Sequence, residues 1–308
     1  MSLLAVGTVA FDSIETPFGR AERILGGSAT YITLAARFFT DDVKLNAVVG
    51  RDFPSDYVSL LKEKGVNLEG LVRDNSGDTF FWAGRYHYDL NQRDTLATHL
   101  NVLADFEPDL PPSYRSSRMI CLGNLDPDVQ RKVLDQVRNP DLVVLDTMNY
   151  WIANTRDSLM DVLRRVDVLI INDAEVRELS GEPNLVKAAK VIREMGPKTL
   201  VIKKGEHGAL LFADETVFVA PAYPLEDIHD PTGAGDTFLG GFAGYLSRTR
   251  SFDTPSLKRA VVLGSALASF VVEAFGPERL LSLTPTEIDE RVAAFHRISA
   301  IPAGLEVA

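Results

Sequence analysis

Short apolar runs alternate with amphipathic stretches along most of the chain. The apolar runs cover residues 3–6, 45–49, 119–122, 142–145, 168–171 and 200–203, and such runs are typical of strands buried on both faces. Between them, residues 54–64, 127–137, 157–166 and 185–195 carry apolar side chains at helical spacing. This alternation predicts an α/β fold with a mostly parallel sheet, helices on both of its faces and ligand sites at the carboxyl ends of its strands.

Two segments interrupt the alternation. Residues 13–25 and 79–90 mix polar and apolar positions as extended chain does, with Phe80, Trp82 and Tyr86 among the larger side chains. No linker rich in Gly, Ser or Pro, no internal repeat and no low-complexity tract marks a boundary in the sequence. We therefore predict one domain over residues 1–300, with the two segments as an insertion, followed by a C-terminal tail at residues 301–308.

Composition narrows the class of protein. The 308 residues carry a net charge of −11, whereas a nucleic-acid-binding protein would present a basic face. The single cysteine, Cys121, excludes an internal disulfide, indicates a reducing compartment and lies in an apolar run as a core residue does. The N-terminus lacks the basic flank of a signal peptide, and no apolar run reaches the roughly 18 residues that cross a membrane. We expect a cytoplasmic protein that binds neither nucleic acid nor membrane.

The most informative motif is DPTGAGDTFLGGF, at residues 230–242. A glycine-rich turn leads into an apolar run that predicts a helix, so the N–H groups of Gly233, Ala234 and Gly235 are left open to bind an anion. Asp236 follows directly, and a carboxylate beside a phosphate site is suited to take the proton of an attacking hydroxyl. The alternative is a simple glycine turn with an acid that favours the helix dipole.

Four further motifs accompany it. They are VGTVAFD at residues 6–12, GGSATY at 26–31, NDAE at 172–175 and KKGEHG at 203–208. In this order and spacing, the motifs resemble those of the PfkB, or ribokinase-like, family of sugar and nucleoside kinases over nearly the whole chain. The resemblance implies a three-layer α/β/α fold with a mostly parallel central sheet. It also implies that residues 13–25 and 79–90 form a small β lid over the acceptor.

The resemblance also implies cofactors and residue roles. It makes Asp236 the general base and the preceding three residues an anion hole. Asn172 and Glu175 would organise Mg²⁺ near ATP, with Glu175 acting through water, although the same pair is spaced as a helix capping box. The remaining implied contacts are Lys203, Gly205, Gly208 and Gly276 for the nucleotide, and Asp230 and Thr232 for a monovalent cation such as K⁺.

The acceptor pocket departs from the family pattern. The resemblance implies that Asp12 binds hydroxyl groups of the substrate, but Ala10 and Tyr31 stand where ribokinase-type sequences carry Asn. Tyr31 either stacks on a substrate ring or is a core residue on a helix face. The full set of expected acceptor contacts is Asp12, Gly26, Gly27, Tyr31, Asn124 and Asn149.

Three functions remain open at this point. We favour an ATP-dependent kinase that phosphorylates a sugar or polyol, and a nucleoside kinase is the alternative within the same chemistry. A ligand-sensing homologue without catalysis would show damage at Asp236 or the glycine turn, and both are intact. The sequence has neither a G-x-x-x-x-G-K-[ST] P-loop nor a G-x-G-x-x-G after its first strand. A homodimer formed through the lid edge is a further expectation.

Overall fold

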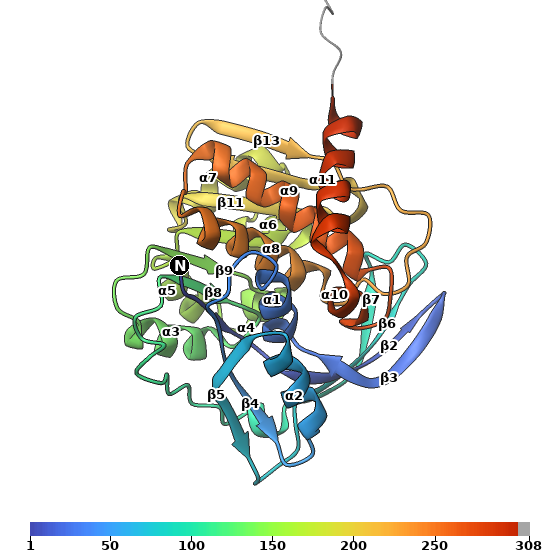
Figure 1. Cartoon of the computed structure of the whole chain (residues 1–308). Helices are drawn as coiled ribbons and strands as arrows, with labels where there is room; N and C mark the ends of the chain where they lie inside the picture. Colours follow the sequence, from blue (N-terminus) through green and yellow to red (C-terminus); the bar gives the residue numbers. More distant parts are fainter. Residues whose placement is uncertain (301–308) are drawn as a thin grey trace, which may run out of the picture.

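A nine-stranded sheet forms the centre of the molecule (Figure 1). The structure is a computed structural model that describes residues 1–300, so the expected C-terminal tail at 301–308 lies outside the described residues. The strand order is β13-β12-β11-β10-β9-β8-β1-β4-β5. Seven of these nine strands pair in parallel, and β12 and β13 add an antiparallel edge. Their bounds are β1 Leu3–Val6, β4 Val43–Gly50, β5 Val66–Asp74, β8 Met119–Leu122, β9 Leu142–Leu145, β10 Val168–Asn172, β11 Thr199–Lys203, β12 Ala209–Ala213 and β13 Thr216–Ala220.

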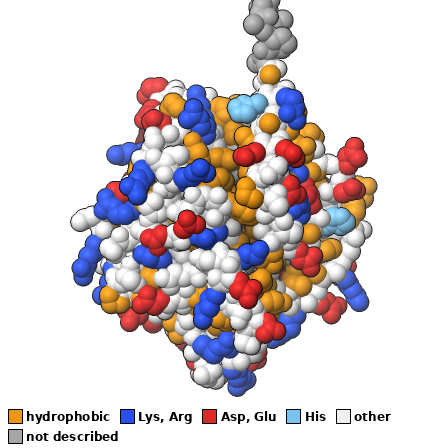
Figure 2. Space-filling view, viewed as in Figure 1, with side chains coloured by type: hydrophobic (Ala, Val, Ile, Leu, Met, Phe, Trp, Pro, Cys, Tyr) orange, Lys and Arg blue, Asp and Glu red, His pale blue; other side chains and the backbone are white. Residues whose placement is uncertain are grey.

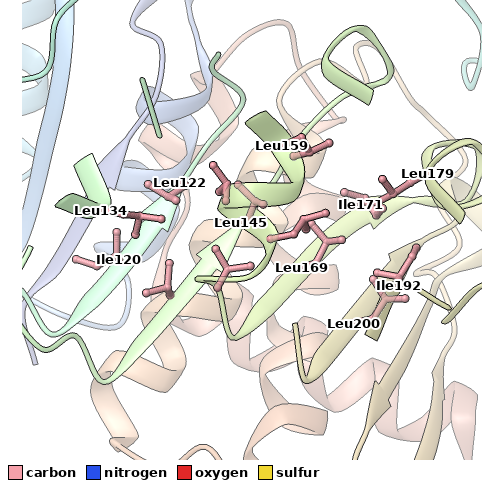
Figure 3. Close-up of a cluster of buried hydrophobic side chains, with 14 of the residues drawn as sticks. Ile120, Leu122, Leu134, Leu145, Leu159, Leu169, Ile171, Leu179, Ile192 and Leu200 are labelled. Carbon is pink, nitrogen blue, oxygen red and sulfur yellow. The ribbon is translucent and has the colours of Figure 1, made fainter. Parts of the chain in front are cut away.

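Helices cover both faces of this sheet, which confirms the three-layer prediction. One face packs against α3 (Pro127–Gln136), α5 (Arg156–Leu163), α6 (Asp173–Ser180) and α7 (Leu185–Glu194), as Figure 3 shows for ten labelled side chains such as Leu122, Leu145 and Leu169. The other face packs against α1 (Ser28–Ala36), α8 (Ala234–Thr249) and α9 (Thr254–Val271). Neighbouring residues of each strand point to opposite faces, so continuous apolar runs serve both cores. Cys121 lies fully buried in the second core, as expected.

A second, four-stranded sheet stands to one side of the first (Figure 1). Its order is β3-β2-β6-β7, with bounds β2 Ala10–Thr16, β3 Gly19–Gly26, β6 Phe81–Tyr86 and β7 Arg93–His99. The predicted lid segments therefore lie in a separate small sheet, but β7 lies beyond the predicted boundary at residue 90. The motif at residues 6–12 is not one continuous strand. The chain leaves the central sheet after Val6, and Asp12 lies inside β2 of the lid.

The remaining elements are short connections and the C-terminal helices. They are α2 (Ser55–Glu63), α4 (Asn149–Asn154), α10 (Glu278–Ser282), α11 (Pro285–Ser299) and the 3-10 turns at Asn101–Leu103 and Gly205–His207. Acidic and basic side chains are interspersed on the face drawn in Figure 2. Within residues 1–300, no helix is long and apolar enough to span a membrane.

Candidate active site

The turn before α8 creates an open helix N-terminus. Gly233 caps the helix with φ 78°, a left-handed conformation that favours glycine, and its carbonyl accepts a hydrogen bond from Thr237 N at 2.8 Å. A side chain at Gly233 would also collide with the ring of Tyr31, since its Cβ would lie 2.5 Å from three ring carbons. Only glycine therefore allows α1 and the start of α8 to approach this closely.

Two of the three expected anion-binding N–H groups are open. Ala234 N donates to Pro231 O at 3.2 Å, whereas the N–H groups of Gly233 and Gly235 donate to no group of residues 1–300. Lys203, at the end of β11, lies directly against Gly235, because a Cβ at Gly235 would stand 2.8 Å from Lys203 Nζ. Two open backbone donors and an ammonium group thus lie together, as an anion site requires, and Ala234 differs from the prediction because its N–H is used within the turn.

Asp236 lies in the first turn of α8 beside these donors. The residue is half-buried, and its Oδ1 is buried with no hydrogen-bond partner in the described part of the chain. Burial raises its pKa to about 7, Asp146 adds to the rise, and Lys203 and Arg93 oppose it. A buried, unpaired carboxylate oxygen with a pKa near neutrality is the state expected of a general base that awaits a hydroxyl donor.

Lys203 is paired with a carboxylate that the motifs did not identify. Its Nζ donates to Asp146 Oδ1 at 3.3 Å, and both side chains are largely buried. Burial lowers the pKa of Lys203, but the charges of Asp146, Glu175 and Asp236 outweigh it and raise that pKa above its ordinary value. Lys203 is therefore a fixed positive charge at the centre of three carboxyl groups.

Asn172 and Glu175 form the capping box at the start of α6. Glu175 N donates to Asn172 Oδ1, and Asn172 N donates to Glu175 Oε2, both at 2.9 Å. Glu175 is buried, and burial together with Asp146 raises its pKa to about 7 against the effect of Lys203 and Arg93. The cap uses only one carboxylate oxygen of Glu175, so the structural and the metal-organising interpretations are compatible.

The carboxyl groups do not form a closed metal site. Among residues 1–300, no three His, Cys, Asp or Glu side chains are grouped closely enough to hold an ion. Mg²⁺ prefers oxygen ligands, keeps several waters and is commonly held by phosphates together with one or two carboxylates. The free oxygen of Glu175 beside an anion site fits that kind of shared, water-rich coordination.

Asp230 is fully buried below the turn. Its two oxygens accept hydrogen bonds from Thr232 N at 2.8 Å and from Gly276 N at 3.1 Å. The Thr232 hydroxyl donates to the hydroxyl of Tyr86, on lid strand β6, at 3.1 Å. The structure thus uses Gly276 to hold Asp230, while the nucleotide contact of Gly276 and the monovalent cation at Asp230 and Thr232 stay predictions.

Asp12 lies on the lid side of the same site. It is 5% exposed and packs on Gly26, where a Cβ would stand 1.9 Å from Asp12 Oδ2. Burial raises its pKa to about 7, Asp230 adds to the rise, and the N–H of Gly27 opposes it. A buried carboxyl group with this pKa needs polar partners, and the hydroxyl groups of an acceptor can supply them.

Tyr31 is not available as a stacking surface. Its side chain is 1% exposed because the ring packs against Gly233, so of the two alternatives Tyr31 is the core residue on a helix face. Its hydroxyl is buried and has no partner within the described residues. Burial raises the pKa of Tyr31 well above its usual range, and Asp12, Asp230 and Asp236 add to the rise. The neutral phenol is therefore a free donor between the two halves of the site.

The lid supplies an indole instead. Trp82 pairs in register with Asp12 across β2 and β6, so both side chains leave the sheet on the same face. Its ring covers Gly84, where a Cβ would lie 2.1 Å from a ring carbon, and the residue is partly exposed. A flat aromatic surface thus lies beside the carboxylate of Asp12.

The other expected residues lie in the connections that follow β8, β9 and β11. Asn124 donates to Met148 Sδ at 3.1 Å and accepts from Trp151 Nε1 at 2.8 Å, so its amide holds the start of α4. Asn149 is the exposed first residue of α4. Gly205 and Gly208 bound the 3-10 turn between β11 and β12.

Three site residues were missed by the sequence motifs. Asp146 directly follows the buried strand β9 and Asn172 ends β10, so both lie at the carboxyl ends of strands, where the fold predicts ligand sites. Tyr86 lies in the predicted lid segment, on the same strand face as Trp82. Arg93 begins β7, whose residues are mostly exposed and carry no alternating apolar pattern.

The sequence of this chain is similar to those of known kinases. The sequence profile of the pfkB family carbohydrate kinases matches residues 6–282. The cytidine kinase of Thermococcus kodakarensis is 28% identical over 281 residues, which cover 90% of this chain and 98% of that protein.

Two solved structures share the fold. The nucleoside kinase of Burkholderia thailandensis in complex with inosine has a TM-score of 0.79 at 18% identity and covers 97% of this chain and 98% of its own. Aminoimidazole riboside kinase from Salmonella enterica, complexed with aminoimidazole riboside and an ATP analog, has a TM-score of 0.74 at 19% identity. It covers 95% of this chain and 100% of its own.

Proposed function

The chain belongs to the pfkB family of carbohydrate kinases, and from its site we propose that it transfers the γ-phosphate of ATP to a hydroxyl group of a nucleoside. Its family and relatives identify it as a phosphotransferase of sugars or nucleosides. The observation that carries the reaction is the buried, unpaired Oδ1 of Asp236 beside two open backbone donors and Lys203.

The reaction follows from these positions. The acceptor hydroxyl gives its proton to Asp236 while its oxygen attacks the γ-phosphorus, and the bond to the β-phosphate oxygen breaks to release ADP. The N–H groups of Gly233 and Gly235, with Lys203, stabilise the negative charge on the transferred group. Mg²⁺, organised by Glu175 through water, would neutralise charge on the nucleotide phosphates when bound.

The acceptor proposal rests on the lid. Asp12 can accept hydrogen bonds from sugar hydroxyls, and Trp82 on the neighbouring strand offers a surface on which a base can stack. All three proteins named above are kinases of a riboside by name or are bound to one, which supports a nucleoside over the free sugar or polyol favoured by sequence. Free ribose should be a weak substrate, because Ala10 and the buried Tyr31 supply none of the amide contacts of ribokinase-type sites.

A substrate panel tests the acceptor. ADP release from Mg²⁺·ATP would be measured with cytidine, adenosine, inosine, ribose, fructose and myo-inositol. We expect the nucleosides to give the highest kcat/KM. Efficient turnover of ribose, fructose or myo-inositol, with no turnover of a nucleoside, would contradict the nucleoside assignment. It would still support kinase activity.

The variant Asp236→Asn tests the chemistry. It should leave ATP affinity nearly unchanged and lower kcat by about 10²-fold or more, because general-base catalysis typically contributes that much. Asp56→Asn, which changes an exposed acid in the first turn of α2, is the matched control and should keep wild-type turnover. An Asp236→Asn enzyme with most of its turnover would exclude Asp236 as the base.

A further inference from the structure

A buried glutamine joins the carboxyl ends of two strands of the central sheet. Gln130 lies on α3 and is 0% exposed, although the buried stripe of a helix on a sheet is ordinarily apolar. Its Nε2 donates to Gly123 O at 2.8 Å and to Asp146 O at 3.4 Å. Gly123 directly follows β8 and Asp146 directly follows β9. One side-chain amide therefore holds the backbone at the ends of both strands.

The sheet itself also fixes the backbone of Asp146. Asp146 N donates to Leu122 O at 2.8 Å, so the hydrogen bonds between β8 and β9 continue to this residue. Leu145 packs in the core that lies under α3 and α5 (Figure 3). Successive residues of a strand point to opposite faces, so the carboxyl group of Asp146 points to the face that α8 covers.

Lys203 reaches the same face from a different strand. Ile202 shares the core of Leu145, so Lys203 also points to the face that α8 covers. In the sheet, β10 lies between β9 and β11, and the lysine crosses it to bring Nζ within 3.3 Å of Asp146 Oδ1. The same Nζ lies against Gly235, where a Cβ would stand 2.8 Å away. The ammonium group thus lies between the Asp146 carboxylate and the open end of α8.

Stability alone does not explain this ion pair. The side chains of Lys203 and Asp146 are only 18% and 9% exposed, and the desolvation of two charges can cost more free energy than their attraction returns. A lysine is also a point charge on a flexible stem, which a partner must hold in place. Electrostatic stabilisation of a transition state depends on charges that are fixed before the reaction, and the Asp146 carboxylate fixes this one.

We propose that Gln130 and Asp146 are positioning residues that hold the Lys203 ammonium group against the transferred phosphoryl group. Gln130 fixes the backbone of Asp146, and the Asp146 carboxylate fixes Lys203. This inference rests on the proposed kinase function. It extends the active site through the sheet to α3, and it gives a task to a buried polar residue of that helix.

A double-mutant cycle tests whether Asp146 acts through Lys203. Lys203→Met should lower kcat by about 10²-fold, as loss of a donor to developing charge typically does. Asp146→Asn should lower kcat by roughly tenfold, because a neutral amide replaces the charged partner of the lysine. The double variant should lose no more than Lys203→Met alone, since Asp146 then has no ammonium group to position. Losses that multiply in the double variant would overturn the role of Asp146.

Gln130→Met tests the next step of the chain. Methionine has a similar shape and removes both donors, so kcat should fall severalfold in the wild-type background and stay unchanged in the Lys203→Met background. An equal fall in both backgrounds would show that Gln130 does not act through Lys203. If Gln130→Met does not fold, as its thermal midpoint would show, the variants of Asp146 still decide whether Lys203 is positioned.

The alkaline side of the pH profile separates positioning from a structural role. Burial lowers the pKa of Lys203, and Asp146 is the largest of the charges that raise it, ahead of Glu175 and Asp236. In Asp146→Asn, kcat should therefore decline at a lower pH than in the wild type, because the lysine loses its proton earlier. An unchanged alkaline decline would show that the carboxylate only supports the fold.

Asp167→Asn is the matched control. Asp167 lies at the opposite end of the same strands, and its Oδ2 accepts a hydrogen bond from Val143 N at 2.8 Å. The variant therefore weakens a backbone contact of β9 away from the site. It should lower the thermal midpoint and leave both kcat and the alkaline decline as in the wild type.

A binding measurement separates this inference from the proposed function. ADP with fluoroaluminate mimics the phosphoryl group in transfer, and its affinity should fall in Asp146→Asn but not in Asp167→Asn, while affinity for ADP alone stays equal. Equal fluoroaluminate affinity in the two variants would overturn the positioning role. If no acceptor supports ADP release by the wild type, the proposed function fails, and the binding comparison still decides whether Asp146 positions Lys203.

Discussion

Tyr31 carries a hydroxyl group that the folded protein does not use. The group is buried without a partner in the described chain, which ordinarily costs stability, and it lies where the charges of Asp12, Asp230 and Asp236 are all felt. A ligand that accepts a hydrogen bond from this hydroxyl group would explain why it is kept. Ribokinase-type sequences carry an Asn side chain at this position, whereas the phenol ring of Tyr31 packs against Gly233 and its hydroxyl group has no partner in the described chain.

Tyr31→Phe tests this reading. The variant keeps the ring against Gly233, so the thermal midpoint should stay equal or rise slightly, since an unpaired buried hydroxyl is removed. Loss of one hydrogen bond to the acceptor should lower kcat/KM for the acceptor roughly tenfold. A lower thermal midpoint with unchanged kcat/KM would show that the hydroxyl is structural.

Single residues were predictable where local backbone geometry determines their role. A glycine turn before an apolar run identifies an open helix N-terminus, and this located Gly233, Gly235 and Asp236 from sequence alone. Asp146 has no such motif, because its role depends on a lysine that reaches it from a different strand. The burial of Tyr31 was equally hidden, since it requires α1 to pack on the turn before α8.

At the scale of elements, the start of α6 combines a structural and a chemical task. The capping box of Asn172 and Glu175 satisfies two backbone N–H groups, and the pKa of the same Glu175 carboxyl group is raised to about 7 by burial and by Asp146 of the site. The start of α11 has the same box from Thr284 and Glu287, where Glu287 also pairs with Arg279. The two boxes share their backbone role, so they form a natural control pair.

Glu175→Gln should separate the two tasks. The amide oxygen can still accept from Asn172 N, so stability should change little, whereas the Mg²⁺ concentration for half-maximal rate should rise severalfold with acceptor KM unchanged. Glu287→Gln should lower the thermal midpoint through its lost ion pair without changing the Mg²⁺ dependence. An unchanged Mg²⁺ requirement in Glu175→Gln would leave Glu175 with its capping role only.

Elements were predictable in proportion to the strength of their pattern. The helix expected at 127–137 is α3 and that at 185–195 is α7, because both bury a regular apolar stripe. The strand β7 was missed because it is an edge strand of the lid. Its side chains are mostly exposed, so its sequence has no alternation of apolar and polar residues. The two lid edges, β3 and β7, are where the predicted homodimer would form.

For the molecule as a whole, the site brings several buried carboxyl groups together, and this burial makes the stability of the fold depend on pH. The chain has a net charge of −11, and Asp12, Glu175 and Asp236 each have a pKa raised to about 7, with burial as the largest cause. In an unfolded chain such groups titrate near pH 4. The folded protein therefore holds protons between about pH 4 and 7 that the unfolded chain has released.

The sign of this linkage predicts opposite pH trends for stability and activity. Because the folded-state pKa is raised, the stabilisation from these groups is complete below about pH 4 and is lost as pH rises through 7. The thermal midpoint of the ligand-free protein should thus fall from pH 5 to pH 8. Over the same range, kcat/KM should rise with a midpoint near pH 7, since Asp236 must be deprotonated to act as the base. Asp236→Asn should flatten the fall in thermal midpoint, and Asp56→Asn should leave it as in the wild type. Differential scanning fluorimetry across this range measures the first trend, and a flat profile in the wild type would show that these carboxyl groups titrate as in the unfolded chain.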